Sequence, residues 1–70
     1  MNYEYADAYL EITFPKSGNI RRIKKSIIKE ISQVSDKTGT PYVKIWVQGD
    51  CYVFDGNFEE FEKNIKTVYI

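Results

Sequence analysis

The 70-residue sequence predicts a single α+β domain spanning residues 1–70, built as two layers in the order β-α-β-β-α. Three patterns support this prediction: a period-two alternation near the N-terminus, a helical spacing of isoleucines in the next segment, and a hairpin followed by a capped helix. Strands with one apolar face and helices with one apolar stripe bury these surfaces against each other. We therefore expect a three-stranded sheet with both helices packed on one face.

The first strand is predicted at residues 8–14, where apolar side chains alternate with Tyr9 and with more polar residues. This alternation is typical of a strand that is buried on one side. Pro15 ends the strand, because proline has no backbone N–H to donate. The Lys-Ser-Gly-Asn segment that follows has the composition of a turn.

The first helix is predicted at residues 19–35. Apolar residues recur there at intervals of three and four, which places them in one narrow stripe of a helix: Ile20, Ile23, Ile27, Ile31 and Val34. Gly39 offers a left-handed position after the helix, and Pro41 prevents the helix from continuing.

A β-hairpin is predicted after this helix, in residues 42–56. Gly49-Asp50 suits a two-residue type II′ turn, because glycine stands at the first central position. This turn would set two cross-strand pairs on one face, Val47 with Tyr52 and Ile45 with Phe54.

The second helix is predicted to begin after Asn57. Asn57 and Glu60 have the spacing of a capping box, and glutamates in the first turns suit the positive end of the helix dipole. An apolar stripe supports the helix: Phe58, Phe61 and Ile65. Two conformations of residues 68–70 stay open, a continuation of this helix or a short edge strand.

The composition argues against an enzyme. The chain has no histidine, the most common acid–base and metal-binding residue, and its one cysteine, Cys51, cannot form an internal disulfide. On a helix, Glu59, Glu60 and Glu62 would spread around the exposed side instead of facing one reacting group. We expect no catalytic residue, no metal site and no cofactor.

The sequence also predicts a cytoplasmic protein that does not enter a membrane. No apolar run approaches the roughly 20 residues that a membrane-spanning helix needs. The acidic and aromatic N-terminus lacks the pattern of a signal peptide. A single cysteine suits a reducing compartment.

Acids and bases are segregated along the chain although the net charge is zero. Residues 16–29 contain six bases and no acid, and residues 47–62 contain five acids and no base. Along the predicted helix, Arg21, Lys25 and Lys29 would stack one turn apart, and each such like-charge pair costs roughly 0.2–0.5 kcal/mol. Four residues form the candidate surface for an anion or a partner: Arg21, Arg22, Lys25 and Lys29.

Two explanations of this basic surface stay open. The acidic second helix could neutralise it, in which case it is a solvated face whose exposed ion pairs contribute only about 0–1 kcal/mol each. Alternatively, it contacts an anionic partner, either an acidic protein surface or the phosphates of nucleic acid. The neutral total charge favours the protein over the nucleic acid.

The sheet face turned away from the helices is predicted to be uncovered. Five residues on it form the candidate partner-binding surface: Tyr9, Tyr42, Lys44, Trp46 and Val53. Exposed apolar patches usually mark interaction surfaces, and Trp and Tyr are enriched where interfaces gain most of their binding energy. The face would be covered either by a protein partner, with a homodimer as the simplest case, or by the chain's own residues 1–5 or 68–70.

One part of the chain resembles a family of DNA-binding domains. The stretch TPYVKIWVQGDCYVFDGNFEEFEKNI loosely resembles the strand-turn-strand-helix core of integrase arm-type and AP2-like DNA-binding domains, over about a third of the chain from Pro41 to Ile65. The resemblance implies DNA contacts at Lys44 and Trp46. The chain departs from that pattern in having a predicted basic helix where those domains have a further strand, and in having only Lys44 as a base on the outer face of the hairpin.

These observations together predict a small non-catalytic interaction protein of the inhibitor or adaptor type, a kind that phages and other mobile elements encode. It would dock an acidic protein partner through the open sheet face and the basic helix. The alternative is a DNA- or RNA-binding regulator that contacts phosphates through the basic face of the first helix and through the hairpin.

Overall fold

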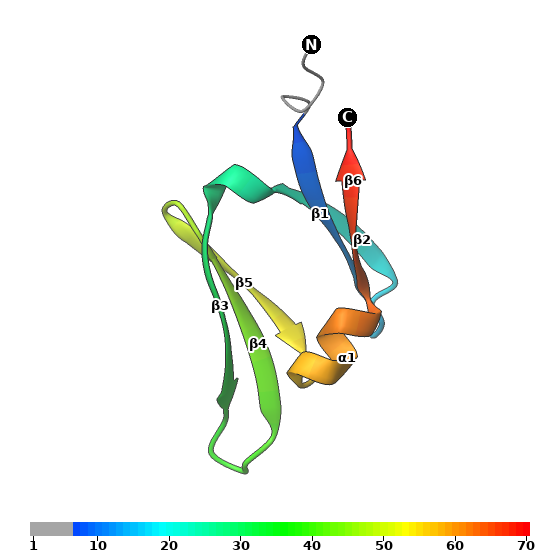
Figure 1. The fold of residues 1–70 in the computed structure, drawn as a ribbon. Helices are drawn as coiled ribbons and strands as arrows, with labels where there is room; N and C mark the ends of the chain where they lie inside the picture. Colours follow the sequence, from blue (N-terminus) through cyan, green and yellow to red (C-terminus); the bar gives the residue numbers. More distant parts are fainter. Residues whose placement is uncertain (1–6) are drawn as a thin grey trace.

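The computed structural model describes residues 7–70 and consists mainly of β-strands (Figure 1). Six strands form two antiparallel three-stranded sheets, one in the order β2-β1-β6 and the other in the order β3-β4-β5. The elements in chain order are β1 (Ala8–Phe14), β2 (Asn19–Lys24), the 3-10 turn η2 (Lys25–Ile27), β3 (Ile28–Ser35), β4 (Pro41–Val47), β5 (Asp50–Asp55), α1 (Phe58–Lys63) and β6 (Ile65–Tyr69). The predicted arrangement of two helices on one sheet is therefore wrong.

The largest difference lies in residues 19–35, where a long helix was expected. This segment forms β2, the turn η2 and β3, and the turn carries the chain from one sheet to the other. β2 pairs with β1, and β3 pairs with β4. A bend of this kind is a common way for a chain to make a corner between two packed sheets.

The isoleucine spacing was misleading because residues three apart lie on one side of a helix but on opposite sides of a strand. In β2, Ile23 is buried whereas Ile20 is 62% exposed. In β3, Ile31 packs against the core whereas Val34 lies on the opposite side of the strand, across from Tyr42. The β-branched side chains that made up the stripe favour strands over helices.

Strand formation in this segment avoids one cost of the helix and gives each sheet its third strand. The like charges of Arg21, Lys25 and Lys29 are not stacked, because they lie in β2, in η2 and in β3. A two-stranded hairpin alone is only marginally stable, and β2 and β3 each complete a three-stranded sheet.

The predicted hairpin is confirmed as β4 and β5, but its register differs by two residues. The pairs are Val43 with Phe54, Ile45 with Tyr52, and Val47 with Asp50. The loop is therefore Gln48-Gly49, with the positive φ of 80° at Gly49 in the second central position, as in a type II turn. Because the shift is an even number of residues, the same side chains still face the core.

The predicted helix start is confirmed at α1. The Asn57 side chain accepts a hydrogen bond from the backbone N–H of Glu60, and the Glu60 side chain accepts one from the backbone N–H of Asn57. The helix ends at Lys63, earlier than the apolar stripe suggested, and Ile65 belongs to β6. β6 pairs with β1, which settles the open question about residues 68 and 69 in favour of a strand.

The core lies between the two sheets and beneath α1. Its buried residues are Leu10, Ile12, Ile23, Val43, Ile45, Val47, Phe54 and Phe61. Phe54 of β5 lies 6.0 Å from Phe14 of β1 and 5.3 Å from Phe61 of α1, between ring centroids. This aromatic cluster connects both sheets and the helix. Outside the core, the side-chain oxygen of Gln33 on β3 accepts a hydrogen bond from the backbone N–H of Phe58 at 2.8 Å.

Candidate functional site

The outer face of β3-β4-β5 brings together four of the predicted partner-binding residues. On β4, the buried Val43, Ile45 and Val47 alternate with residues that point outward. The outward residues Tyr42, Lys44 and Trp46 form a row, and Val53 of β5 lies directly opposite Lys44. We call these four residues the aromatic face.

The aromatic face exposes large apolar side chains. Trp46 is 39% exposed and Val53 is 47% exposed, whereas Tyr42 is half-buried. The ammonium group of Lys44 lies 5.2 Å from the Trp46 ring and 6.0 Å from the Tyr42 ring. Both distances are within the range of a cation–π interaction, so the two rings hold the ammonium group between them.

The cross-strand neighbours of Lys44 carry no charge. Lys44 lies opposite Ser32 on one side and Val53 on the other. Asp55, farther along β5, pairs with Lys16 at 3.6 Å. Within residues 7–70, no carboxylate lies within ion-pair distance of Lys44.

Tyr9 does not belong to the aromatic face, contrary to the prediction. It lies on β1 opposite Lys24 of β2 and Val68 of β6, on the outer face of the other sheet. The prediction assumed one sheet, and the structure has two. Because β6 pairs with β1, residues 68 and 69 do not cover the aromatic face. The other expected cover, residues 1–5, lies outside the described residues.

The basic helix face does not exist, because its residues are distributed over three elements. Arg21 and Arg22 are neighbours on β2 and therefore point to opposite sides of the strand. Lys25 lies in the turn η2, and Lys29 lies in β3 where the pairing with β4 is irregular. These four cations are close in sequence, but the structure does not place them on one surface.

Part of the positive charge is neutralised on the outer face of β2-β1-β6. Glu11 of β1 accepts a hydrogen bond from Arg22 Nε at 2.9 Å and lies 3.5 Å from Lys66 Nζ of β6. The Arg22 hydrogen bond, with the charges of Lys66 and Arg22 adding to it, holds the pKa of Glu11 below its ordinary value. Lys24 pairs with Asp7 at 3.4 Å.

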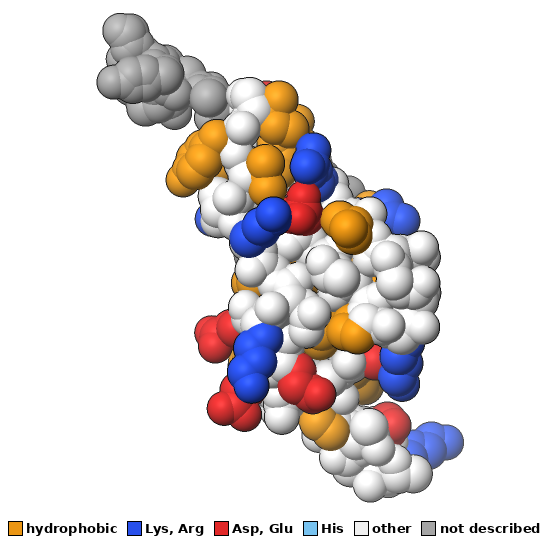
Figure 2. All heavy atoms as spheres, turned by 90° about the vertical axis from the view of Figure 1, so that its right-hand side faces the viewer, with side chains coloured by type: hydrophobic (Ala, Val, Ile, Leu, Met, Phe, Trp, Pro, Cys, Tyr) orange, Lys and Arg blue, Asp and Glu red, His pale blue; other side chains and the backbone are white. Residues whose placement is uncertain are grey.

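These ion pairs bear on one of the two open explanations, in which the second helix supplies the neutralising acids. In the described part of the chain, Glu59, Glu60 and Glu62 make no ion pair, and the partners of the bases are Glu11, Asp7 and Asp55 instead. Figure 2 shows acidic and basic side chains lying next to one another on this side of the molecule, not in two separate patches.

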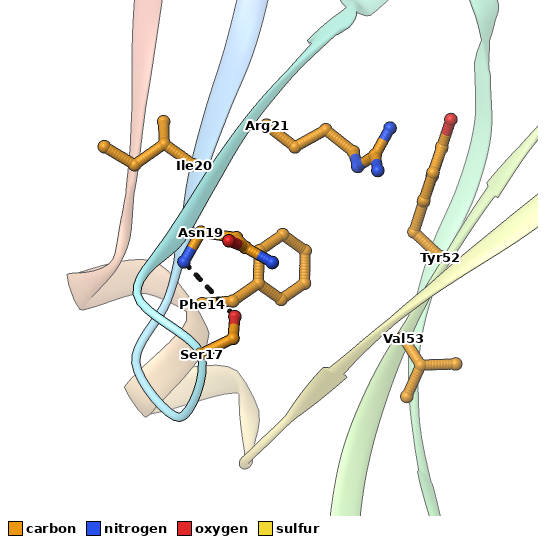
Figure 3. A pocket seen from close by; sticks show the side chains of 7 residues that line it. All are labelled: Phe14, Ser17, Asn19, Ile20, Arg21, Tyr52 and Val53. Atoms are coloured by element: carbon orange, nitrogen blue, oxygen red, sulfur yellow. Dashed lines mark hydrogen bonds between the residues drawn. The ribbon is translucent and has the colours of Figure 1, made fainter.

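A cleft of about 360 Å³ lies where the edge strands β2 and β5 face each other (Figure 3). Its lining residues are Phe14, Ser17, Asn19, Ile20, Arg21, Tyr52 and Val53. The Arg21 guanidinium lies 4.8 Å from the centroid of the Tyr52 ring. Sequence reasoning missed this cleft, because its walls come from segments that a long helix would have kept apart.

The described residues contain no group of three or more His, Cys, Asp and Glu side chains placed to hold a metal ion. No helix within residues 7–70 combines the length and apolar character required to span a membrane. The sequence matches no protein-family model, and comparisons with curated proteins and with solved structures gave no match.

Proposed function

We propose that the chain is a non-catalytic protein-binding module, of the inhibitor or adaptor type, that docks a partner through the aromatic face. The observation that carries this proposal is the exposure of Trp46 and Val53 on an ordered three-stranded sheet. Water is a poor environment for such side chains, and burying them against a partner would be favourable. Trp is also the residue most enriched among those that dominate binding energy.

The partner surface should be acidic at its centre. Lys44 stands in the middle of the aromatic face, between two rings and between two uncharged cross-strand neighbours. A partner that covered Trp46 with apolar groups alone would bury this ammonium group without a counter-charge, which is costly. A carboxylate opposite Lys44 would remove that cost, in a region from which water is excluded.

Nucleic acid fits this face less well than a protein does. The residues paired across the outer face of the β3-β4-β5 sheet include one base, Lys44, and two acids, Glu30 and Asp55, of which Asp55 pairs with Lys16. A phosphate backbone would be repelled by the acids, whereas affinity for nucleic acid comes largely from bases that contact phosphates. The helix that was expected to supply those bases is absent.

The test compares capture of a partner by the intact chain with capture by four variants. Trp46→Ala and Lys44→Glu change the aromatic face, and Tyr69→Ala and Lys63→Glu are matched changes at exposed positions elsewhere. We expect one protein with an acidic surface to bind the intact chain and both control variants. Its affinity, measured by calorimetry with the purified partner, should fall by at least about 30-fold for Trp46→Ala, the loss typical of a residue that dominates an interface.

Other outcomes would overturn the proposal. If Trp46→Ala binds the same partner as tightly as the intact chain does, the aromatic face is not the docking surface. If sedimentation shows a dimer that Trp46→Ala converts to a monomer, the occupant is a second copy of the chain. If the intact chain binds random duplex DNA at low salt and Lys44→Glu does not, the occupant is nucleic acid.

A further inference from the structure

The cleft between β2 and β5 contains a positive charge that the described part of the chain does not neutralise. Arg21 extends from β2 across the opening toward Tyr52 of β5 (Figure 3). The nearby Asp55 pairs with Lys16, and within residues 7–70 no carboxylate lies within ion-pair distance of Arg21. We propose that this cleft binds a small organic anion whose phosphate or carboxylate group pairs with Arg21.

The Tyr52 ring prepares Arg21 for this contact. The Arg21 guanidinium carbon lies 4.8 Å from the centroid of the Tyr52 ring, which is within the range of a cation–π interaction. The guanidinium group has five N–H donors, and one aromatic ring does not satisfy them all as hydrogen bonds. Two of these parallel donors match the two oxygens of a carboxylate or phosphate, which a lysine ammonium cannot do. The arrangement therefore holds the side chain in place before an anion arrives.

The remaining walls indicate what the anion should be attached to. The Asn19 amide and the Ser17 hydroxyl add polar groups on the side of the β1–β2 turn, where Ser17 accepts a hydrogen bond from the backbone N–H of Asn19. Phe14 adds an aromatic ring, whereas Ile20 and Val53 point to the opposite sides of their strands from Arg21 and Tyr52 (Figure 3). A ligand with one anionic end and a flat apolar body would satisfy both kinds of wall.

The volume of the cleft limits the ligand to a small molecule. About 360 Å³ is near the lower end of the range of roughly 300–1,000 Å³ for sites that bind small ligands. This site is separate from the aromatic face, with which it shares only Val53, and it does not depend on the proposed docking function.

The test is an NMR titration of the amide signals with four probes: phenyl phosphate, benzoate, inorganic phosphate and benzyl alcohol. We expect phenyl phosphate or benzoate to cause saturable shifts at residues 14–21 and 52–53. The stronger of these two probes identifies the preferred anionic group. Inorganic phosphate lacks the apolar body and benzyl alcohol lacks the charge, so each should bind at least about fivefold more weakly.

Two neighbouring arginines provide matched variants. Arg21→Gln should weaken binding of the stronger probe at least about tenfold, because a charge-assisted hydrogen-bond pair is lost. Arg22→Gln removes the same charge from the other side of β2 and should change the affinity less than about twofold. Arg21→Lys keeps the charge without the planar group and should give an intermediate affinity. The amide spectrum of each variant also reports whether the chain is folded.

Three results would overturn this inference. The first is the absence of saturable shifts at these residues with any probe up to about 10 mM, a range that includes weak specific binding. The second is an equal loss of affinity in Arg21→Gln and Arg22→Gln, which would indicate a general charge effect. The third is equal binding of phenyl phosphate and inorganic phosphate, because the aromatic ring of Phe14 would then contribute nothing.

Discussion

Each sheet has a charged residue at the centre of its outer face, but the cross-strand neighbours of these two residues differ. Glu11 stands at the centre of β1, the middle strand of β2-β1-β6, and Lys44 stands at the centre of β4, the middle strand of β3-β4-β5. Glu11 has Arg22 opposite it on one side and Lys66 on the other. Lys44 has uncharged residues on both sides and aromatic rings along its own strand.

This difference shows that the residues directly opposite a charged side chain determine whether it forms an ion pair within the molecule. Residues directly opposite on antiparallel strands have side chains close enough for an ion pair, so the face around Glu11 satisfies its own central charge. The face around Lys44 does not, and it also exposes Trp46. The second face therefore offers a partner apolar surface together with a central charge that no carboxylate of residues 7–70 neutralises.

The largest expected effect tests whether the two faces share one core. Phe54 is fully buried and its ring contacts Phe14 of one sheet and Phe61 of the helix. Phe54→Ala should lower the free energy of unfolding by about 3–5 kcal/mol, because it leaves a cavity between both sheets. Urea unfolding followed by circular dichroism measures the loss. The neighbouring Val53 points outward, so Val53→Ala should change the free energy of unfolding by less than about 0.5 kcal/mol.

The loss from Phe54→Ala should appear as one cooperative transition. If a variant at Phe54 unfolded one sheet while the other stayed folded, the two faces would belong to separate units. The comparison between Glu11 and Lys44 would then lose its basis.

The next effect compares the two central charges directly. Glu11→Gln should lower the free energy of unfolding at about pH 7, because Arg22 and Lys66 lose their common partner. Lys44→Gln should lower it less, because no carboxylate of the described residues pairs with Lys44 and only its contacts with the Trp46 and Tyr42 rings are lost. Urea unfolding of both variants at low and at high salt measures the difference, which about 1 M salt should reduce by screening.

The pH dependence of the Glu11 effect has a defined sign. The pKa of Glu11 is lower in the folded protein than its ordinary value of 4.5. Its ionised form therefore stabilises the fold above that pH, and the stabilisation is lost as the pH falls through the folded pKa. The stability difference between the intact chain and Glu11→Gln should shrink toward zero as the pH falls below the folded pKa. A difference that grows on acidification would contradict this account.

The smallest effect concerns a turn that lies on neither face. The Asp36 carboxylate accepts hydrogen bonds from the Thr38 hydroxyl at 2.7 Å, the Thr38 N–H at 2.8 Å and the Thr40 N–H at 3.0 Å. These bonds, led by that from the Thr38 side chain, hold the pKa of Asp36 below its ordinary value of 3.8.

Asp36→Asn should therefore lower the stability slightly above about pH 4 and leave it unchanged below the folded pKa. Urea unfolding across this pH range measures the change. Combining Asp36→Asn with Glu11→Gln should give additive losses, because the turn and the ion pairs share no partner. A clear departure from additivity would show that the acid sensitivity of the Glu11 face depends on the turn.

Much of the fold could be predicted wherever the signal was local. The alternation in β1, the hairpin of β4 and β5, and the capping box of Asn57 and Glu60 are all present. The hairpin faces were correct although the register was not, because period-two burial survives a two-residue shift. Four of the five predicted aromatic-face residues share one surface for the same reason.

The structure of residues 19–35 could not be predicted from such local signals. Its isoleucine spacing is compatible with a helical stripe and also with two strands joined by a turn, so periodicity alone does not decide between them. Because of this error, the prediction placed Tyr9 on the same sheet as Trp46 and grouped the four candidate cations on one helix. It also missed the cleft between Arg21 and Tyr52.

The sequence by itself determined the parts whose structure depends on neighbours a few residues away: one strand, one hairpin, one helix start, and the outward direction of Trp46 and Lys44. Only the tertiary structure decided that residues 19–35 form strands, that Glu11 meets Arg22 and Lys66, and that Arg21 reaches Tyr52. The physical reason is that strand pairing and ion pairing between strands depend on which distant segments become neighbours. That choice is made by burial of the shared core and not by local preference.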